Sequence, residues 1–167
     1  TWTKLFSMTL VVIIEFSDYQ CGHCRHMSSV VQEVAQKFPS VQVVVRELPI
    51  FGKESEFAAK VAMIAAKEGK FSAVHHALMK AKDLNKESVI KLAEANHIDR
   101  EALNKALKDN DALDAEIREN VRLSQQLQIM GTPAFIVADV QGKSIEFVPG
   151  AMPKERLVSL IKKVLYC

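Results

Sequence analysis

The sequence predicts an α/β fold in which two strand-containing segments enclose an all-helical insertion. Residues 1–52 contain two short, β-branched apolar runs with an amphipathic stretch between them. Residues 129–167 contain two more short strands before a final amphipathic stretch. Residues 53–128, in contrast, follow helical periodicity throughout. The predicted order is therefore β-α-β, a helical block, and then β-β-α.

In the first segment, residues 10–16 are short, continuous and β-branched, which is typical of a strand buried on both faces. A helix begins near Cys21, places its apolar side chains on one stripe, and stops at Pro39. Residues 41–48 form the second strand. Such a strand–helix–strand unit favours a parallel pair joined by a right-handed crossover.

The helical block divides at residues that break or cap helices. Gly69 separates the first two helices, and Asp99 is a typical N-cap for the fourth. The predicted helices cover residues 55–68, 71–82, 86–96, 100–109 and 111–128.

The last segment returns to strands. Residues 134–138 and 144–148 are expected to pair antiparallel around a tight turn at Gln141-Gly142, and a helix over 153–165 follows. We therefore expect two domains. The sheet domain takes residues 1–52 and 129–167, and the inserted helical domain takes residues 53–128.

The composition excludes several classes of protein. The 167 residues are 49% apolar and 25% charged, which is ordinary for a globular protein. The 22 Lys and Arg residues nearly balance the 20 Asp and Glu residues, so no basic face for nucleic acid is expected. The apolar runs, such as Leu10 to Ile14, are all too short to span a bilayer. No leader is visible before Thr1, so the compartment stays open at this point.

Cys21-Gly22-His23-Cys24 places a Cys-x-x-Cys pair where the first helix begins. Next to a strand–helix–strand unit, this spacing is typical of a thioredoxin-like redox motif. The unpaired N–H groups and the positive end of the helix dipole favour a thiolate at Cys21. Cys24, one turn later, can close a short disulfide with it. His23 can donate a hydrogen bond or a positive charge to the thiolate, which makes the disulfide more oxidising.

A Cys-x-x-Cys pair is also half of a zinc site, and His23 and His26 could be further ligands. The sequence offers no second Cys-x-x-Cys and no distant His pair to complete a four-ligand set. His75 and His76 are adjacent on a predicted helix, so they point in different directions and are expected at the surface or partly buried. We therefore expect redox chemistry that uses neither a metal nor a cofactor.

Thr132-Pro133 immediately precedes the third predicted strand. In a thioredoxin-like fold, a cis-proline loop at this place packs beside the redox cysteines and exposes the backbone of Thr132 to an extended substrate. The alternative is an ordinary trans proline that opens a strand. Met130, just before the loop, and Phe51 are expected to line an apolar substrate groove.

Glu15 is a carboxylate inside an otherwise apolar strand, six residues before Cys21. Burial would raise its pKa, and Glu15 could then take or return the proton of Cys24 during exchange. The alternative is a residue near the strand end that turns to solvent.

Three segments carry a resemblance: Glu-Phe-Ser-Asp-Tyr-Gln-Cys-Gly-His-Cys at 15–24, Glu-Leu-Pro-Ile-Phe-Gly at 47–52 and Gly-Thr-Pro-Ala-Phe at 131–135. Together they resemble the DsbA-like family of bacterial disulfide oxidoreductases, thioredoxin-fold proteins with an inserted helical domain. The resemblance implies that Cys21 is the nucleophile, Cys24 the resolving cysteine and Pro133 the cis-proline. It also implies substrate contacts at Gly22 and Thr132, unfolded thiol-containing clients, a membrane redox partner and a location in the bacterial periplasm.

Two residues bear on the direction of exchange. The best-known oxidase of the family has Pro-His between its cysteines, whereas this chain has Gly22-His23, as in protein disulfide isomerase. Thr132 is a residue type also found before the cis-proline of bacterial disulfide isomerases. The leading expectation is an oxidase that introduces disulfides into exported proteins. The alternatives are an isomerase or reductase, and a non-catalytic client-binding module whose cysteines are structural or bind zinc.

The termini carry two further expectations. Trp2, Leu5 and Phe6 fit either the remnant of an N-terminal dimerisation helix, which would imply a homodimer, or a frayed or short edge strand. Cys167 is expected to be an exposed free thiol, because no neighbour in the sequence tunes it.

Overall fold

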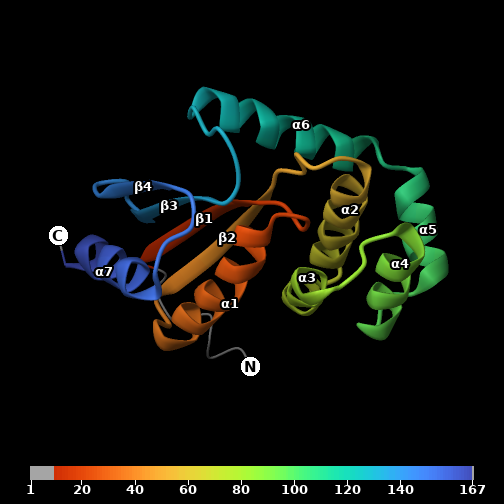
Figure 1. Cartoon of the computed structure of the whole chain (residues 1–167), viewed down its shortest axis with the longest axis horizontal. Coiled ribbons are helices and arrows are strands. Elements are labelled where there is room, and N and C mark those ends of the chain that lie inside the picture. The colour runs from red at the N-terminus through yellow and green to blue at the C-terminus, as the bar shows by residue number, and fades with distance from the viewer. Residues whose placement is uncertain (1–9, 167) are drawn as a thin grey trace.

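The computed structural model describes residues 10–166, and its elements follow the predicted order (Figure 1). The strands are β1 (Val11–Ser17), β2 (Val41–Glu47), β3 (Ala134–Asp139) and β4 (Ile145–Pro149). The helices are α1 (Gly22–Lys37), α2 (Lys53–Lys67), α3 (Phe71–Lys80), α4 (Lys86–Ala95), α5 (Arg100–Lys108), α6 (Asp111–Gln126) and α7 (Lys154–Leu165). The predicted fold class is confirmed. The ends of the elements shift slightly from the predicted ones, as is usual where terminal turns fray.

The four strands form one mixed sheet in the order β2-β1-β3-β4. β1 and β2 are parallel, with Val11 opposite Val41, which confirms the predicted crossover pair. β3 is antiparallel to β1 and forms a hairpin with β4, whose turn places Gly142 at a positive φ of 70°. Because β1 is paired on both sides, the loop that leaves its carboxyl end starts from a fixed position.

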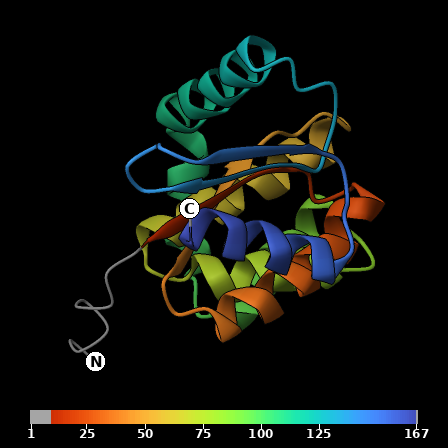
Figure 2. The ribbon, with the colours of Figure 1, turned by 90° about the vertical axis from the view of Figure 1, so that its left-hand side faces the viewer.

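The helices cover the two faces of the sheet differently. α1 and α7 lie on one face, and α6 lies on the other (Figures 1 and 2). The face under α1 carries a large apolar cluster in which Ile13 and Phe135 are fully buried. On the α6 face, Phe16 and Leu48 are buried. Glu15 follows Ile13 by two residues along β1, so its side chain points toward α1.

The helices α2 to α6 build an apolar cluster of their own, separate from that of the sheet. Val61 and Leu78 lie fully buried within it. Tyr19, Cys21 and Cys24 belong to the same cluster, although they come from the loop after β1 and from the start of α1. The turn that carries the cysteines therefore lies where the helical block meets the sheet (Figure 1).

The cap predicted at Asp99 is confirmed, since its side chain accepts a hydrogen bond from the backbone N–H of Ala102 at 2.9 Å. Within residues 10–166, no helix combines the length and the apolar character needed to cross a membrane. The division into a sheet domain and an inserted helical domain stays a prediction. The predictions for Trp2, Leu5, Phe6 and Cys167 lie outside the described residues.

Candidate active site

Cys21 caps the N-terminus of α1. Its extended backbone, with φ −78° and ψ 118°, lets Sγ accept a hydrogen bond from the backbone N–H of Cys24 at 3.2 Å. The backbone N–H of Cys21 donates to the carbonyl of Asp18 at 3.2 Å and closes the turn before the helix. A helix N-terminus carries about half a positive charge. The local backbone therefore favours a negative charge on the sulfur of Cys21.

Cys24 lies one turn later and is fully buried. Burial raises the pKa of its thiol to about 12, and the hydrogen bond with Cys21 adds to the effect. Cys21 retains a small exposed surface. The two thiols are thus unequal: Cys21 can meet a partner at the surface, whereas Cys24 holds its proton until a base removes it.

Gly22 and His23 are exposed in the first turn of α1. A Cβ atom at Gly22 would meet nothing within 4 Å, so the space above this residue is open. The roles expected for Gly22 and His23 stay predictions. His26, the further ligand considered for zinc, is also exposed. Across residues 10–166, no three His, Cys, Asp or Glu side chains gather in a way that could hold a metal ion.

The Thr132–Pro133 peptide is cis and lies against the first cysteine. The thiol of Cys21 donates to the carbonyl oxygen of Thr132 at 3.4 Å. This loop leads into β3, which pairs with β1, so one sheet positions both the cysteine loop and the proline loop. Met130, at the start of the proline loop, is 97% exposed, and Ile50 and Phe51 are also exposed. The contact of Met130 and Phe51 with a substrate stays a prediction.

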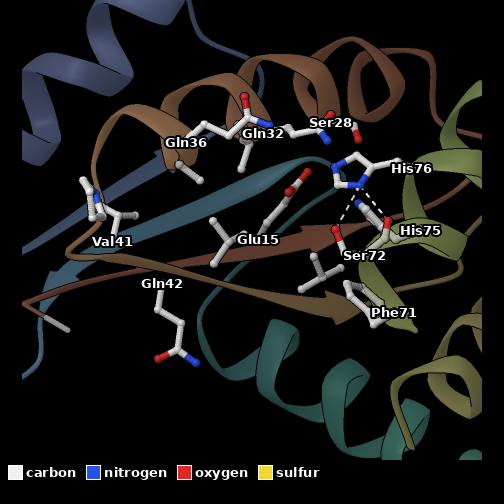
Figure 3. Close-up of a pocket in the computed structure, with 15 residues that line it drawn as sticks. Glu15, Ser28, Gln32, Gln36, Val41, Gln42, Phe71, Ser72, His75 and His76 are labelled. Atoms are coloured by element: carbon white, nitrogen blue, oxygen red, sulfur yellow. Dashed lines mark hydrogen bonds between the residues drawn. The ribbon is translucent and has the colours of Figure 1, made fainter. Parts of the chain in front are cut away.

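Glu15 is buried, so the alternative of a side chain turned to solvent is wrong. Burial raises the pKa of its carboxyl to about 8. Glu15 lines a cleft of about 770 Å³ between α1, β2 and α3, together with Ser28, which follows Cys24 by one helical turn (Figure 3). A carboxyl that keeps its proton at neutral pH is suited to exchange it with a buried thiol.

Asp18 is a buried centre of hydrogen bonds that sequence reasoning missed. Its Oδ1 accepts from the backbone N–H of Gln20 at 2.7 Å and from the hydroxyl of Ser55 at 2.6 Å. Its Oδ2 accepts from the backbone N–H groups of Ile50 at 2.7 Å and Phe51 at 3.1 Å. Asp18 thus ties the cysteine loop to the segment between β2 and α2. In the sequence, only the position of Asp18 between a predicted strand and the Cys-x-x-Cys pair could have indicated this role.

Tyr19, Glu47 and His75 form a second buried group. The hydroxyl of Tyr19 donates to Oε1 of Glu47 at 2.9 Å and lies 2.8 Å from Nδ1 of His75. The expectation that His75 lies at the surface or is only partly buried is wrong. Its side chain is buried because Phe71 stacks on its ring and Tyr19 contacts it edge-on. His76 keeps a partly exposed position, as expected.

Nearly the whole chain matches a known protein family. Residues 12–162, from β1 into α7, match the DSBA-like thioredoxin domain family. The match includes the cysteine pair, the Thr132–Pro133 loop and all of the helical block.

Several solved structures share this fold. A thioredoxin-like oxidoreductase from Silicibacter pomeroyi DSS-3 is 34% identical, with a TM-score of 0.83 over 92% of this chain and 85% of that one. The thiol-disulfide exchange protein alpha-DsbA2 from Wolbachia pipientis is 28% identical, with a TM-score of 0.81 over 92% and 81%. The catalytic domain of Proteus mirabilis ScsC is 26% identical, with a TM-score of 0.80 over 94% and 84%.

Two longer proteins contain a similar segment. The Na(+)/H(+) antiporters NhaA 3 of Salinispora tropica and NhaA 1 of Salinispora arenicola are 28% and 26% identical over 130 residues. The similar segment is 76% of this chain but only 20% of either antiporter, so the likeness concerns that segment alone. Because the family match runs from β1 into α7 and the 34%-identical relative covers most of both chains, this chain belongs to the DSBA-like thioredoxin domain family, as a thiol–disulfide oxidoreductase of the DsbA and ScsC type.

Proposed function

We propose that this protein introduces disulfides into exported client proteins through Cys21 and Cys24. The observation that carries the proposal is the hydrogen bond from the Cys24 N–H to the Cys21 sulfur at the start of α1, at 3.2 Å. This donor and the helix dipole stabilise a charged Cys21 in the reduced pair. Stabilising the reduced pair makes the disulfide a stronger oxidant. His23, exposed in the same turn, is proposed to add to the effect.

The reaction starts from the Cys21–Cys24 disulfide. A client thiolate attacks the sulfur of Cys21, a bond between the client and Cys21 forms, and the bond to Cys24 breaks. A second client thiolate then attacks the client sulfur of this mixed disulfide, and Cys21 leaves as a thiolate. The client has lost two electrons and gained a disulfide, and the protein pair has gained the two electrons.

Glu15 is proposed to supply the proton in this sequence. When the disulfide opens, Cys24 is released as a thiolate in a buried site where its pKa is about 12, so it takes up a proton at once. Glu15 is buried, faces α1 and keeps its proton up to about pH 8. It can therefore give a proton to Cys24 during reduction of the pair and take it back during reoxidation.

The client is proposed to lie along the cis-proline loop. The backbone of Thr132 lies next to the sulfur of Cys21 and can pair with an extended client segment. Gly22 leaves open space beside the cysteine, and Met130, Ile50 and Phe51 present exposed apolar surface around the loop. An unfolded client that exposes cysteines and apolar side chains suits this surface.

We also propose that the protein works in the bacterial periplasm, where a membrane redox partner reoxidises it. A periplasmic thioredoxin-like protein from Salmonella enterica serovar Typhimurium supports this, being 26% identical with a TM-score of 0.76 over 94% of this chain and 85% of that one. Within the fold, the sheet domain of residues 1–52 and 129–167 is proposed to carry the chemistry. The inserted domain of residues 53–128 is proposed to bury Cys24 within its apolar cluster.

The reduction potential of the cysteine pair tests the proposal. The protein is equilibrated with a series of glutathione ratios, and the thiols are alkylated and counted by mass spectrometry. We expect a value clearly more oxidising than about −180 mV. A value near about −270 mV would contradict the oxidase and favour the alternative of a reductase or isomerase that starts with Cys21 attacking a wrong client disulfide. Sedimentation would then show whether that enzyme works as a homodimer.

Trapping variants separate both enzymes from a client-binding module. Cys24→Ser leaves Cys21 without its resolving partner and is expected to accumulate a mixed disulfide with a client peptide whose cysteine is supplied as an activated disulfide, from which the activating thiol leaves. Cys21→Ser is the matched control and is expected to trap none. If neither variant forms a mixed disulfide, and zinc co-purifies in equal amount with the protein, the cysteines are structural or metal-binding and the enzymatic proposal fails.

A further inference from the structure

Tyr19 lies between Glu47 of β2 and His75 of α3, and its hydroxyl is within hydrogen-bond distance of both, at 2.9 Å and 2.8 Å. When Glu47 is charged, the single proton of the hydroxyl goes to Glu47, so His75 then presents Nδ1–H to the Tyr19 oxygen. Burial lowers the pKa of His75 to about 3, so the ring is a neutral imidazole with one N–H. The three side chains form a directed chain of donors that ends on the Glu47 carboxyl.

Glu47 and Glu15 lie near each other on the same face of the sheet. Glu15 is in register with Val45, and Ser17 with Glu47, along the parallel strands β1 and β2. Both carboxyls are buried, and each has one oxygen without a hydrogen-bond partner among residues 10–166: Oε1 of Glu15 and Oε2 of Glu47. Burial raises the pKa of Glu47 to about 8, and the charge of Glu15 adds to this. Because the interaction is mutual, a charge on Glu47 raises the proton affinity of Glu15.

The two carboxyls differ in what surrounds them. Glu47 accepts the hydrogen bond of Tyr19, which also contacts His75, and such a bond stabilises the charged form of a carboxyl. Ser17 also lowers the pKa of Glu15, but burial raises it by more. Glu15 lies at the cleft between α1, β2 and α3, which is also lined by His75 (Figure 3). When this buried pair carries a single negative charge, Tyr19 therefore holds the charge on Glu47, and the proton stays on Glu15, next to the cleft.

We propose that Glu47, held by Tyr19 and His75, is a positioning residue that keeps the exchangeable proton of the buried pair on Glu15. The inference rests on the proposed proton transfer between Glu15 and Cys24. When the client thiolate attacks Cys21, the bond from Cys21 to Cys24 breaks and the Cys24 thiolate takes the proton of the Glu15 carboxyl. In reoxidation the S–H bond of Cys24 breaks, the proton returns to the Glu15 carboxylate, and the Cys24 thiolate forms the disulfide with Cys21 as the thiolate of the redox partner leaves. Glu47 touches neither thiol, and it acts through its charge.

Other charged or titratable groups face this pair, and the test holds them constant. They are Asp18 from the cysteine loop, His75 and His76 from α3, and Glu116 from α6. None of them is altered in the two variants that follow, so a difference from the parent protein reports on Glu47 and Tyr19.

The experiment titrates Glu15 directly, by ¹³C NMR of its carboxyl carbon in the reduced full chain, and measures the pH profile of disulfide formation by Cys24 alongside. In Glu47→Gln the neighbouring charge is gone, so the Glu15 midpoint is expected to fall by roughly one pH unit or more. In Tyr19→Phe the donor to Glu47 is gone, so Glu47 takes the proton more readily and the Glu15 midpoint moves in the same direction. The pH profile of disulfide formation follows both shifts.

Matched controls use residues of the same type at the surface. Glu101→Gln in the first turn of α5 and Tyr166→Phe after α7 are expected to leave the Glu15 midpoint unchanged. An unchanged midpoint in folded Glu47→Gln and Tyr19→Phe overturns the inference. Glu15→Gln tests the underlying proposal separately: if it leaves the pH profile as in the parent, the proton-transfer role of Glu15 itself is wrong, whatever Glu47 does. The direction of exchange does not enter the test, because the proton moves in both directions.

Discussion

At the scale of single residues, two buried carboxyls near the cysteine loop lower the stability of the fold. Glu15 and Glu47 are both buried, and burial raises the pKa of each to about 8. A buried carboxyl without full hydrogen bonding costs stability unless it is neutral. The raised pKa values let these carboxyls exchange protons near neutral pH, and their burial costs stability. Such a trade-off is common at sites of proton transfer.

Glu15→Gln is expected to make the protein more stable and its stability less dependent on pH. The native carboxyl keeps its proton to about pH 8, whereas the unfolded one releases it near 4.5. Between these values the unfolded state binds fewer protons, so the stability of the parent falls as pH rises. The gain from the variant should be on the order of 3 kcal/mol at pH 8. Urea unfolding at pH 5 and pH 8 measures it; equal slopes for parent and variant would contradict the buried titration.

Asp18→Ala is expected to destabilise the protein and disorder the cysteine loop. The change leaves the buried hydroxyl of Ser55 and three partly buried backbone N–H groups without their acceptor, at a cost of about 3 kcal/mol. Asp139→Ala is the matched control, because Asp139 also accepts backbone N–H groups but lies at the exposed turn between β3 and β4. Urea unfolding and the rate of thiol–disulfide exchange are measured for both. A rate for Asp18→Ala as high as that of the control would contradict the role of Asp18.

At the scale of elements, the side chain of Arg25 joins α1 to both the cysteine loop and the helical block. Arg25, just after the second cysteine, donates from Nε to the carbonyl of Tyr19 at 2.7 Å and from Nη1 to the carbonyl of Ala81 at 2.6 Å. The first bond fixes the cysteine loop on α1, and the second satisfies a carbonyl at the C-terminal end of α3. A planar guanidinium can make both bonds at once, whereas an ammonium group cannot reach both in the same geometry.

Arg25→Lys is therefore expected to lower the stability by about 2 kcal/mol and to slow exchange at Cys21, because the loop before α1 loses its anchor. Arg122→Lys provides the comparison, since Arg122 is also bonded through two nitrogens but to exposed Glu119 on the same helix. We expect this control to change neither property measurably. Thermal unfolding and the alkylation rate of Cys21 provide the measurements. Equal effects of both substitutions would show that Arg25 does not anchor the loop.

At the scale of the whole molecule, two apolar clusters meet at the redox turn. One cluster joins the sheet to α1 and α7, and the other joins α2 to α6 and includes both cysteines. Cys24 is buried against the helical cluster, while Cys21 lies at the junction beside Thr132. The cysteine pair therefore lies where the two parts of the fold meet.

The reduced protein is expected to be more stable than the oxidised one. Under the proposed oxidase function, the helix start stabilises Cys21 when the disulfide is open, and the disulfide is then the less favoured state of the folded protein. Each 30 mV by which the reduction potential of the pair is more oxidising corresponds to about 1.4 kcal/mol of difference in stability between the reduced and the oxidised protein. Urea unfolding with and without reductant measures it, with Cys24→Ala as a variant that should show no difference. Greater stability of the oxidised form would argue against the oxidase.

The local chemistry of this fold is visible in the sequence. The β-branched runs, the apolar stripe of α1 and the cap at Asp99 each depend on residues within a few positions of one another, and all are present in the structure. The Cys21–Cys24 spacing likewise depends only on one helical turn. The burial of Glu15 follows from its place in an apolar strand.

The tertiary structure alone decided the surroundings of the site. Tyr19 meets Glu47 across 28 residues and His75 across 56, and Asp18 meets Ser55 across 37. The helical period of α3 leaves open which helix face meets the cysteine loop, so His75 was expected nearer the surface than it lies. The sequence by itself determined the elements and the reactive pair, because these depend on neighbours along the chain. Packing between the helical block and the sheet determined which polar side chains are buried with that pair, because only the folded chain brings them together.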